Sequence, residues 1–293
     1  IKVLREILLK DGFVPCESEP ALLQKGEVLV CLYVDDVMGA GPGDELARMW
    51  LTIKKRFEVG GVELGTRFLG LGIEYEAIPG CYAQAAICMA EYIESIVKEF
   101  NIHFPGYKVV PCDAPLSMDP RQVPDDIDEA ADGAYWPAQK IIGMLLWVSR
   151  CYRGDTSGAV SFLSRNIVKW TPSMSRQMAR TVGYLVKTKN WALIMRANEG
   201  EKFHVEVHTD ADLCFPKSQS GWVMCAEGTD GNRIVLDYQS RSQPICADSV
   251  CIAEVISCHL GVRECLEFAH FLYGCVFKNS KYRDPAEESA MVV

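Results

Sequence analysis

The segment that decides the fold is Leu29-Val30-Cys31-Leu32-Tyr33-Val34-Asp35-Asp36-Val37-Met38-Gly39-Ala40. An apolar run leads into two adjacent acids and returns at once to apolar residues, which predicts a β-hairpin with strands at 28–33 and 37–40. Carboxylates in an apolar segment are costly to bury, and a divalent cation held by their oxygens is the usual compensation. The alternative is an ordinary Asp-Asp turn, because acids are common in turns.

Two adjacent acids at a hairpin tip also fit two-metal phosphoryl transfer. That chemistry needs carboxylates held at a fixed point on a rigid element. Asp35 and Asp36 are therefore candidate catalytic and metal-binding residues. Mg²⁺ or Mn²⁺ is the expected cofactor, because both ions prefer oxygen ligands.

The composition is that of an ordinary globular protein. The chain has 293 residues, of which 49% are hydrophobic and 24% charged, and this length predicts one large domain or two moderate ones. No apolar run approaches the ~20 residues of a membrane span, and no signal peptide opens the chain. We therefore expect an intracellular protein, in a cytoplasmic particle or the nucleus, that is neither secreted nor bound to a membrane.

Thirteen cysteines are scattered without paired Cys-x-x-Cys spacing, which favours reduced thiols over a disulfide framework or a zinc site. Cys251, Cys258 and Cys265 are seven residues apart, so we expect them to share the buried face of one helix, with metal binding as the weaker alternative.

The net charge of −9 counts against nucleic-acid binding, because contacts to phosphate dominate that affinity. Local basic clusters leave room for a binding groove all the same. One is Lys54-Lys55-Arg56, and the other comprises Arg176, Arg180, Lys187 and Lys189. Lys54 and Lys55 are candidate contacts to nucleic acid. The alternative is that they lie at a solvated helix C-terminus, where positive charge interacts favourably with the helix dipole.

Short motifs then follow one another in a fixed order. They include Gly12-Phe13, Tyr33-Val34-Asp35-Asp36, Lys55-Arg56-Phe57-Glu58, Phe68-Leu69-Gly70, Cys112-Asp113-Ala114-Pro115-Leu116, Ile142-Gly143-Met144-Leu145-Leu146-Trp147 and Arg153-Gly154-Asp155-Thr156. Together, over residues 10–270, they resemble the C-terminal half of the reverse transcriptase in the Pol polyprotein of copia-type (pseudovirus) LTR retrotransposons. The resemblance implies that Asp35 and Asp36 bind the polymerase metals and that Tyr33 supports the primer terminus or the nucleotide.

The resemblance also implies the architecture, an α/β (α+β) fold in three parts. Residues 1–90 would form a partial reverse transcriptase palm, and residues 91–198 the thumb and connection helices, with an acidic loop at 119–132. Residues 199–293 would form an RNase H-like domain that is incomplete at its C-terminus. Within the first two parts we expect strands at 68–75 and 82–89, and helices at 2–10, 46–57, 91–100, 137–150, 156–169 and 175–188.

A second acidic site follows the alternating segment at residues 203–209. Thr209-Asp210-Ala211-Asp212, Ser220-Gly221-Trp222 and Ile252-Ala253-Glu254-Val255 resemble the metal-binding segments of RNase H. The resemblance implies that Asp210 and Glu254 share a Mg²⁺ ion that serves hydrolysis of the RNA strand in an RNA–DNA hybrid. Asp284 is the candidate third ligand, although Pro285 disfavours a central strand there. The alternative is that Asp210 and Asp212 are turn acids.

In the reverse transcriptases that this chain resembles, a third metal-binding Asp and a fingers subdomain come well before the hairpin in the sequence. The residues that precede the hairpin here supply neither. We therefore expect a piece of a longer Pol polyprotein, or a decayed copy, that does not polymerise DNA on its own. Its expected partners are an RNA/DNA template-primer or RNA–DNA hybrid and the rest of the polyprotein. Two alternatives stay open: a non-catalytic, domesticated or decayed remnant that binds nucleic acid or protein, and a plain α/β protein whose acids occupy turns.

Overall fold

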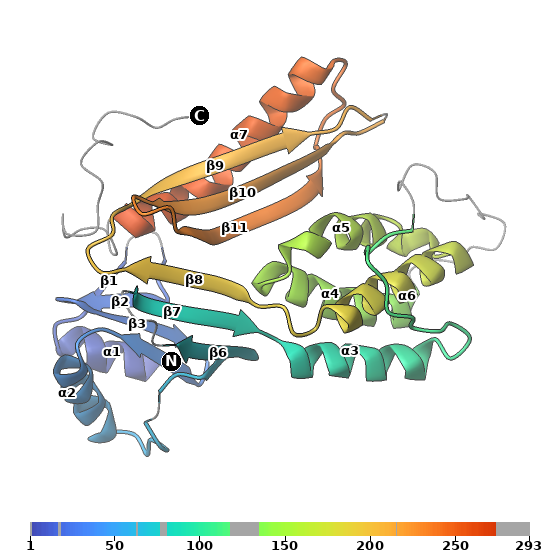
Figure 1. The fold of residues 1–293 in the computed structure, drawn as a ribbon. Helices are drawn as coiled ribbons and strands as arrows, with labels where there is room; N and C mark the ends of the chain where they lie inside the picture. Colours follow the sequence, from blue (N-terminus) through green and yellow to red (C-terminus); the bar gives the residue numbers. More distant parts are fainter. Residues whose placement is uncertain are drawn as a thin grey trace.

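The computed structural model describes residues 2–16, 19–62, 64–76, 81–117, 135–214 and 216–273. The acidic loop expected at 119–132 and the candidate ligand Asp284 lie outside these residues. Helices and antiparallel sheets alternate along the chain (Figure 1), so the predicted α/β class is confirmed. No helix in the described part of the chain is long and apolar enough to cross a membrane.

The first sheet carries the hairpin. Its antiparallel order is β1 (Val14–Pro15), β2 (Leu22–Lys25), β3 (Val28–Tyr33) and β4 (Asp36–Ala40), and α1 (Lys2–Lys10) and α2 (Gly43–Lys54) pack beside it (Figure 1). Alternate residues of β3 are buried, as a half-covered strand requires. A Cβ atom on Gly39 would lie 2.9 Å from the Leu46 side chain, so glycine lets α2 approach the hairpin closely. The predicted hairpin is confirmed, with β4 starting one residue early.

The second sheet joins distant parts of the chain. Its order is β5 (Arg67–Phe68), β6 (Leu71–Glu76), β7 (Cys81–Cys88) and β8 (Leu193–Asn198). The single strand expected at 68–75 is wrong, because Leu69 and Gly70 have φ angles of 52° and 80° and turn the chain back between β5 and β6. Strand β8 pairs with β7 across the boundary that we predicted at residue 90.

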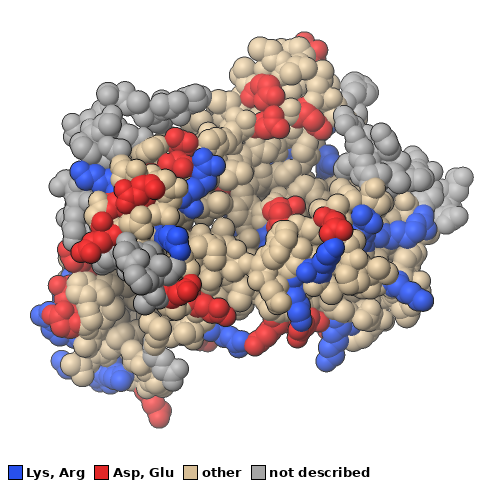
Figure 2. All heavy atoms as spheres, viewed as in Figure 1, with Lys and Arg blue, Asp and Glu red and all other residues tan. Residues whose placement is uncertain are grey.

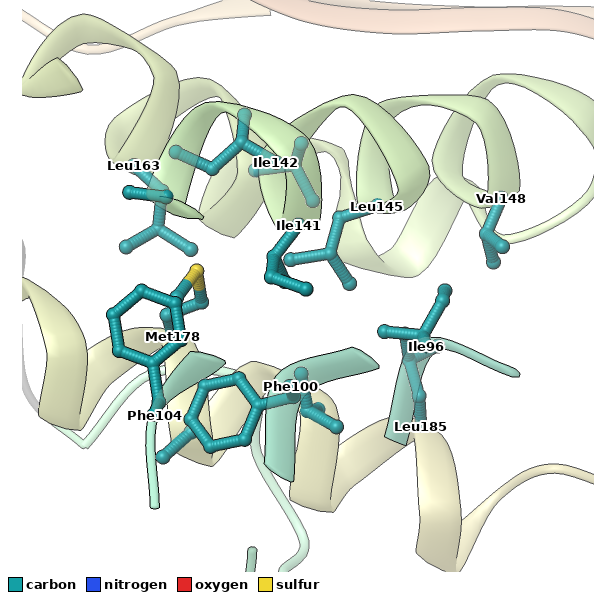
Figure 3. Close-up of a cluster of buried hydrophobic side chains, with 14 of the residues drawn as sticks. Ile96, Phe100, Phe104, Ile141, Ile142, Leu145, Val148, Leu163, Met178 and Leu185 are labelled. Atoms are coloured by element: carbon teal, nitrogen blue, oxygen red, sulfur yellow. The ribbon is translucent and has the colours of Figure 1, made fainter. Parts of the chain in front are cut away.

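Four helices form the largest core of the protein. They are α3 (Ala90–His103), α4 (Trp136–Cys151), α5 (Ser157–Arg165) and α6 (Pro172–Lys187), with short 3-10 turns η3 (Gly154–Thr156) and η4 (Ile167–Lys169). Figure 3 shows Phe100 of α3 facing Ile141 of α4 and Met178 of α6, and all three side chains are fully buried. The helix expected at 156–169 ends early, at Arg165. Helix α6 starts earlier than expected because the Thr171 hydroxyl accepts a hydrogen bond from the Met174 amide.

The third sheet has the order β11 (Arg233–Ser242), β10 (Gln219–Gly228) and β9 (Phe203–Ala211). One face is covered by α7 (Val250–Phe271), and β8 and α5 lie against β11 on the other side (Figure 1). Gly261 of α7 lets the helix come close to Thr209 and Trp222. Of the three cysteines expected to share a buried face of this helix, Cys265 is buried, whereas Cys251 is exposed in the first turn. That expectation is therefore wrong for Cys251.

Candidate functional site

The tip of the first hairpin is a two-residue turn. Tyr33 and Asp36 are paired directly across the strands, which leaves Val34 and Asp35 as the turn. Val34 has a φ of 48°, and a β-branched residue in this left-handed region is strained. The turn exposes both acids and leaves half of the Tyr33 side chain in solvent. The sequence-predicted residues Tyr33, Asp35 and Asp36 therefore stand together at one exposed point.

This turn lines a cleft with a volume of about 620 Å³. Asp35 and Asp36 form part of one wall, and the segment between α2 and β5, including Phe57 and Gly65, forms much of the rest. Arg67 also lines the cleft, but its guanidinium is paired with Glu91 at 2.5 Å. Two exposed carboxylates beside open space are a donor set that fits Mg²⁺ or Mn²⁺. Within the described residues, no third His, Cys, Asp or Glu joins them in a cluster of metal-ligating groups.

The predicted basic contacts do not form one continuous groove. Lys54 and Lys55 are exposed at the end of α2, and residues on either side of them line the cleft while they themselves do not. In the second cluster, Lys187 pairs with Asp113 and Lys189 with Glu94. Figure 2 accordingly shows acids interspersed with the Lys and Arg residues of the face in view.

Asp210 lies inside strand β9 rather than after it. The methyl group of its neighbour Thr209 lies against Gly261 of α7, so the pleat directs the Asp210 side chain to the opposite face. Glu254 is half-buried on α7 itself. Ser257, one turn further along α7, donates a hydrogen bond of 2.7 Å to the Asp210 carbonyl oxygen. The helix therefore holds the backbone of Asp210, while the two acidic side chains start from different sides of the sheet.

Asp212 closes the end of the β9–β10 ladder. Its carboxylate accepts a hydrogen bond from the Gln219 amide at 2.6 Å, and its own amide donates to the Gln219 carbonyl oxygen. Asp212 therefore caps the end of the two strands, as predicted by the alternative that it is a turn acid. Asp210 instead lines a cavity of about 550 Å³ between the third sheet and the helical core, together with Tyr152, Asp155 and Tyr238.

A buried polar network lies beside this cavity. From the sequence, its residues stood out only as part of the motif Arg153-Gly154-Asp155-Thr156. The Arg153 side chain is 3% exposed and donates two hydrogen bonds to Asp155, at 2.9 and 2.7 Å. It also donates to the Thr188 carbonyl and hydroxyl oxygens, at 3.2 and 2.6 Å. Burial raises the pKa of Asp155, but the hydrogen bonds from Arg153 and Tyr184 outweigh it and hold that pKa below its usual range. The network ties the end of α4 to the end of α6.

Gly154, inside the same motif, connects the helical core to the third sheet. A Cβ atom on Gly154 would lie 2.7 Å from the ring of Tyr238 on β11, so this ring packs directly on the glycine backbone. Burial raises the pKa of the Tyr238 hydroxyl above its usual range. A side chain at position 154 would therefore meet the Tyr238 ring.

Sequence reasoning missed a second group of metal-ligating side chains. Glu206, His208 and Glu227 approach one another on the third sheet, and Asp210 and Glu254 do not belong to this group. The signal was present in the alternating run His204-Val205-Glu206-Val207-His208, where every second residue is polar and shares one face.

The sequence is similar to that of a known transposon protein. The chain is 26% identical, over 238 residues, to a Saccharomyces cerevisiae protein named "Putative transposon Ty5-1 protein YCL074W". The match covers 77% of this chain and 72% of the yeast protein. No family model matches the sequence. The similarity indicates a transposon-related protein. The expectation of a transposon-related polypeptide is confirmed at this level of detail.

Proposed function

We propose that this chain is a part of the reverse transcriptase and ribonuclease H of a copia-type retrotransposon. The observation that carries the proposal is the hairpin turn that presents Asp35 and Asp36, side by side and exposed, at the edge of a cleft. The similarity to a transposon protein supports it. The other motifs occur along the sequence in the order expected for such an enzyme.

In this proposal Asp35 and Asp36 hold Mg²⁺ or Mn²⁺ through their carboxylate oxygens. A metal bound there supplies the positive charge that activates a hydroxyl and stabilises the phosphoryl group during transfer. The half-exposed ring of Tyr33 offers a stacking surface for the primer terminus or the nucleotide. Lys54 and Lys55 are free to meet phosphates of a template-primer, since both are exposed at the end of α2.

We further propose that the chain alone does not polymerise DNA. Positioning of the reactants and metals supplies most of the rate in phosphoryl transfer. In the described part of the chain, Asp35 and Asp36 have no third acidic partner close enough to complete their site. Activity would then require the rest of the Pol polyprotein as a partner.

The RNase H half of the proposal rests on Asp210 and Glu254, with Asp284 as the candidate third ligand. A three-stranded sheet with α7 on one face supports it. A second candidate function, a non-catalytic remnant that binds nucleic acid or protein, is favoured by one specific observation. The Asp210 side chain leaves the sheet on the face away from α7, which carries Glu254.

Metal-dependent cleavage of a labelled RNA–DNA hybrid separates these two candidates. An active RNase H site predicts cleavage in Mg²⁺ or Mn²⁺ that is lost in Asp210→Asn and Glu254→Gln. Asp248→Asn is the matched control, because Asp248 is an exposed acid of the same part of the chain. Absence of cleavage by the folded chain would favour the remnant.

The hairpin is tested separately by Mn²⁺ binding, followed through the electron paramagnetic resonance signal of free Mn²⁺. We expect the number of Mn²⁺ ions bound per chain to fall by at least one when Asp35 and Asp36 are both changed to Asn, while ions bound at other sites remain. Glu27→Gln is the matched control, since Glu27 is an exposed acid in the turn between β2 and β3 of the same sheet. Equal Mn²⁺ binding by the double variant would contradict the proposed metal site.

A further inference from the structure

Three metal-ligating side chains gather on the face of the third sheet that is opposite α7. Glu206 and His208 extend from β9, and Glu227 extends from the adjacent strand β10. One ligand atom from each of the three lies within 4.8 Å of the other two. The strand register places Glu227 directly opposite His204, so His204 belongs to the same face. Two imidazoles and two carboxylates therefore share a small area of two hydrogen-bonded strands.

The distances suit a metal ion. Glu206 lies between the two histidines, 2.9 Å from His204 Nε2 and 3.3 Å from His208 Nε2. Two ligands at about 2.0–2.1 Å from a tetrahedral Zn²⁺ ion are about 3.4 Å apart. The two separations from Glu206 are close to this value, and a ligand atom of Glu227 lies within 4.8 Å of those of Glu206 and His208. Imidazole nitrogen together with carboxylate oxygen is a ligand set that binds Zn²⁺ and related transition metals.

The charge and exposure of the cluster also allow a cation to enter. The side chains of His208 and Glu206 are 54% and 40% exposed, and His208 lines the cavity beside the helical core. Glu227 is more buried and pairs with Arg233, whose side chain is mostly exposed. Two carboxylates against one guanidinium leave the cluster with net negative charge.

A neighbouring thiol is not part of this ligand set. Cys225 is paired with Glu206 across the strands and is buried. Its sulfur atom is not among the ligand atoms that come together in the group of Glu206, His208 and Glu227. The ligands on this face are therefore nitrogen and oxygen atoms, and this gives the site a spectroscopic signature of its own.

We propose that Glu206, His208 and Glu227, with His204 beside them, form a binding site for a divalent transition-metal ion, with Zn²⁺ as the ion to test. The site is separate from the acids that we assign to Mg²⁺, since neither Asp210 nor Glu254 belongs to the cluster. A bound ion would link β9 to β10 through their side chains.

The test is a titration of the reduced full chain with Co²⁺, followed by displacement with Zn²⁺. We expect one Co²⁺ per chain, with visible d–d bands and no thiolate-to-cobalt charge transfer in the near ultraviolet. We expect Glu206→Gln and His208→Ala each to weaken binding by ~10-fold or more. His259→Ala is the matched control, since His259 is an exposed histidine on α7 outside the cluster, and should bind as the unchanged chain does.

Circular dichroism establishes that each variant is folded, and His208→Gln replaces His208→Ala if the alanine variant is not. Both altered side chains are partly exposed, so their loss leaves no buried orphan group. Three results would overturn the proposal: no stoichiometric Co²⁺ binding by the intact chain, a thiolate charge-transfer band, or affinity unchanged in Glu206→Gln and His208→Ala.

Discussion

Replacement of Arg153 by Met is the sharpest test of how the helical core is held together. The change removes a buried guanidinium that makes two hydrogen bonds to Asp155 and two to Thr188. The guanidinium also lies 5.3 Å from the ring centre of Tyr184 and 5.6 Å from that of Trp191. Methionine retains much of the apolar volume, so the loss measured is mainly that of the charge and its hydrogen bonds.

The expected loss in the free energy of unfolding is about 3 kcal/mol. Removing one partner of a buried ion pair costs about 3–5 kcal/mol, because the other partner is left uncompensated. The lower end applies here, since the side chain of Asp155 is 34% exposed and can be rehydrated in part. Urea denaturation of the full chain, followed by circular dichroism, measures the loss as a fall in the midpoint.

Arg150→Met, in the last turn of α4 just before Arg153, provides the matched control. Arg150 pairs with Asp237 at 2.8 Å, but its side chain is 56% exposed, and exposed pairs contribute about 1 kcal/mol or less. A loss below about 0.5 kcal/mol for Arg153→Met, or equal losses for the two variants, would refute the reasoning that burial makes the Arg153 network stabilising.

Three further predictions concern single positions. The folded-state pKa of Asp155 is depressed, so its stabilisation should be complete above pH ~4 and lost as pH falls further, and the stability advantage of the unchanged chain over Asp155→Asn should shrink in an acid titration. Val34→Gly should raise the free energy of unfolding by up to ~1 kcal/mol, because relief of the positive φ outweighs the added backbone entropy; a lower melting temperature would contradict this. Gly154→Ala should cost ~1–3 kcal/mol in denaturant titration because the new methyl group meets the Tyr238 ring, whereas Gly143→Ala, with open space around it, should cost nothing.

The first hairpin could be predicted nearly residue by residue. Runs of apolar residues flank two adjacent acids, and this pattern is local in the sequence. The strand expected at 68–75 failed for a reason that is also local. Apolar residues continue through the turn at Leu69 and Gly70, so hydrophobicity alone does not reveal the change of direction there.

Long-range features could not be read from the sequence. The pairing of β8 with β7 joins residues separated by more than a hundred positions, and no periodicity reports such a partner. The burial of Arg153 is likewise set by Tyr152, Tyr184 and Trp191, whose rings surround it. The residue type identified Asp210 as a candidate, but the sequence placed it after the strand. Because β9 extends two residues past the predicted end, Asp210 lies within the pleat, and this determines which face its side chain leaves from.

The central claim is that the acids of the first hairpin form a metal site that serves nucleic acid. The most direct measurement is the affinity of the chain for a fluorescent template-primer duplex, by anisotropy, with and without Mg²⁺. The account predicts that Mg²⁺ tightens binding and that changing both Asp35 and Asp36 to Asn abolishes the metal effect, while Glu27→Gln leaves it intact. An affinity that is the same with and without Mg²⁺, or a metal effect that remains in the double variant, would contradict this claim.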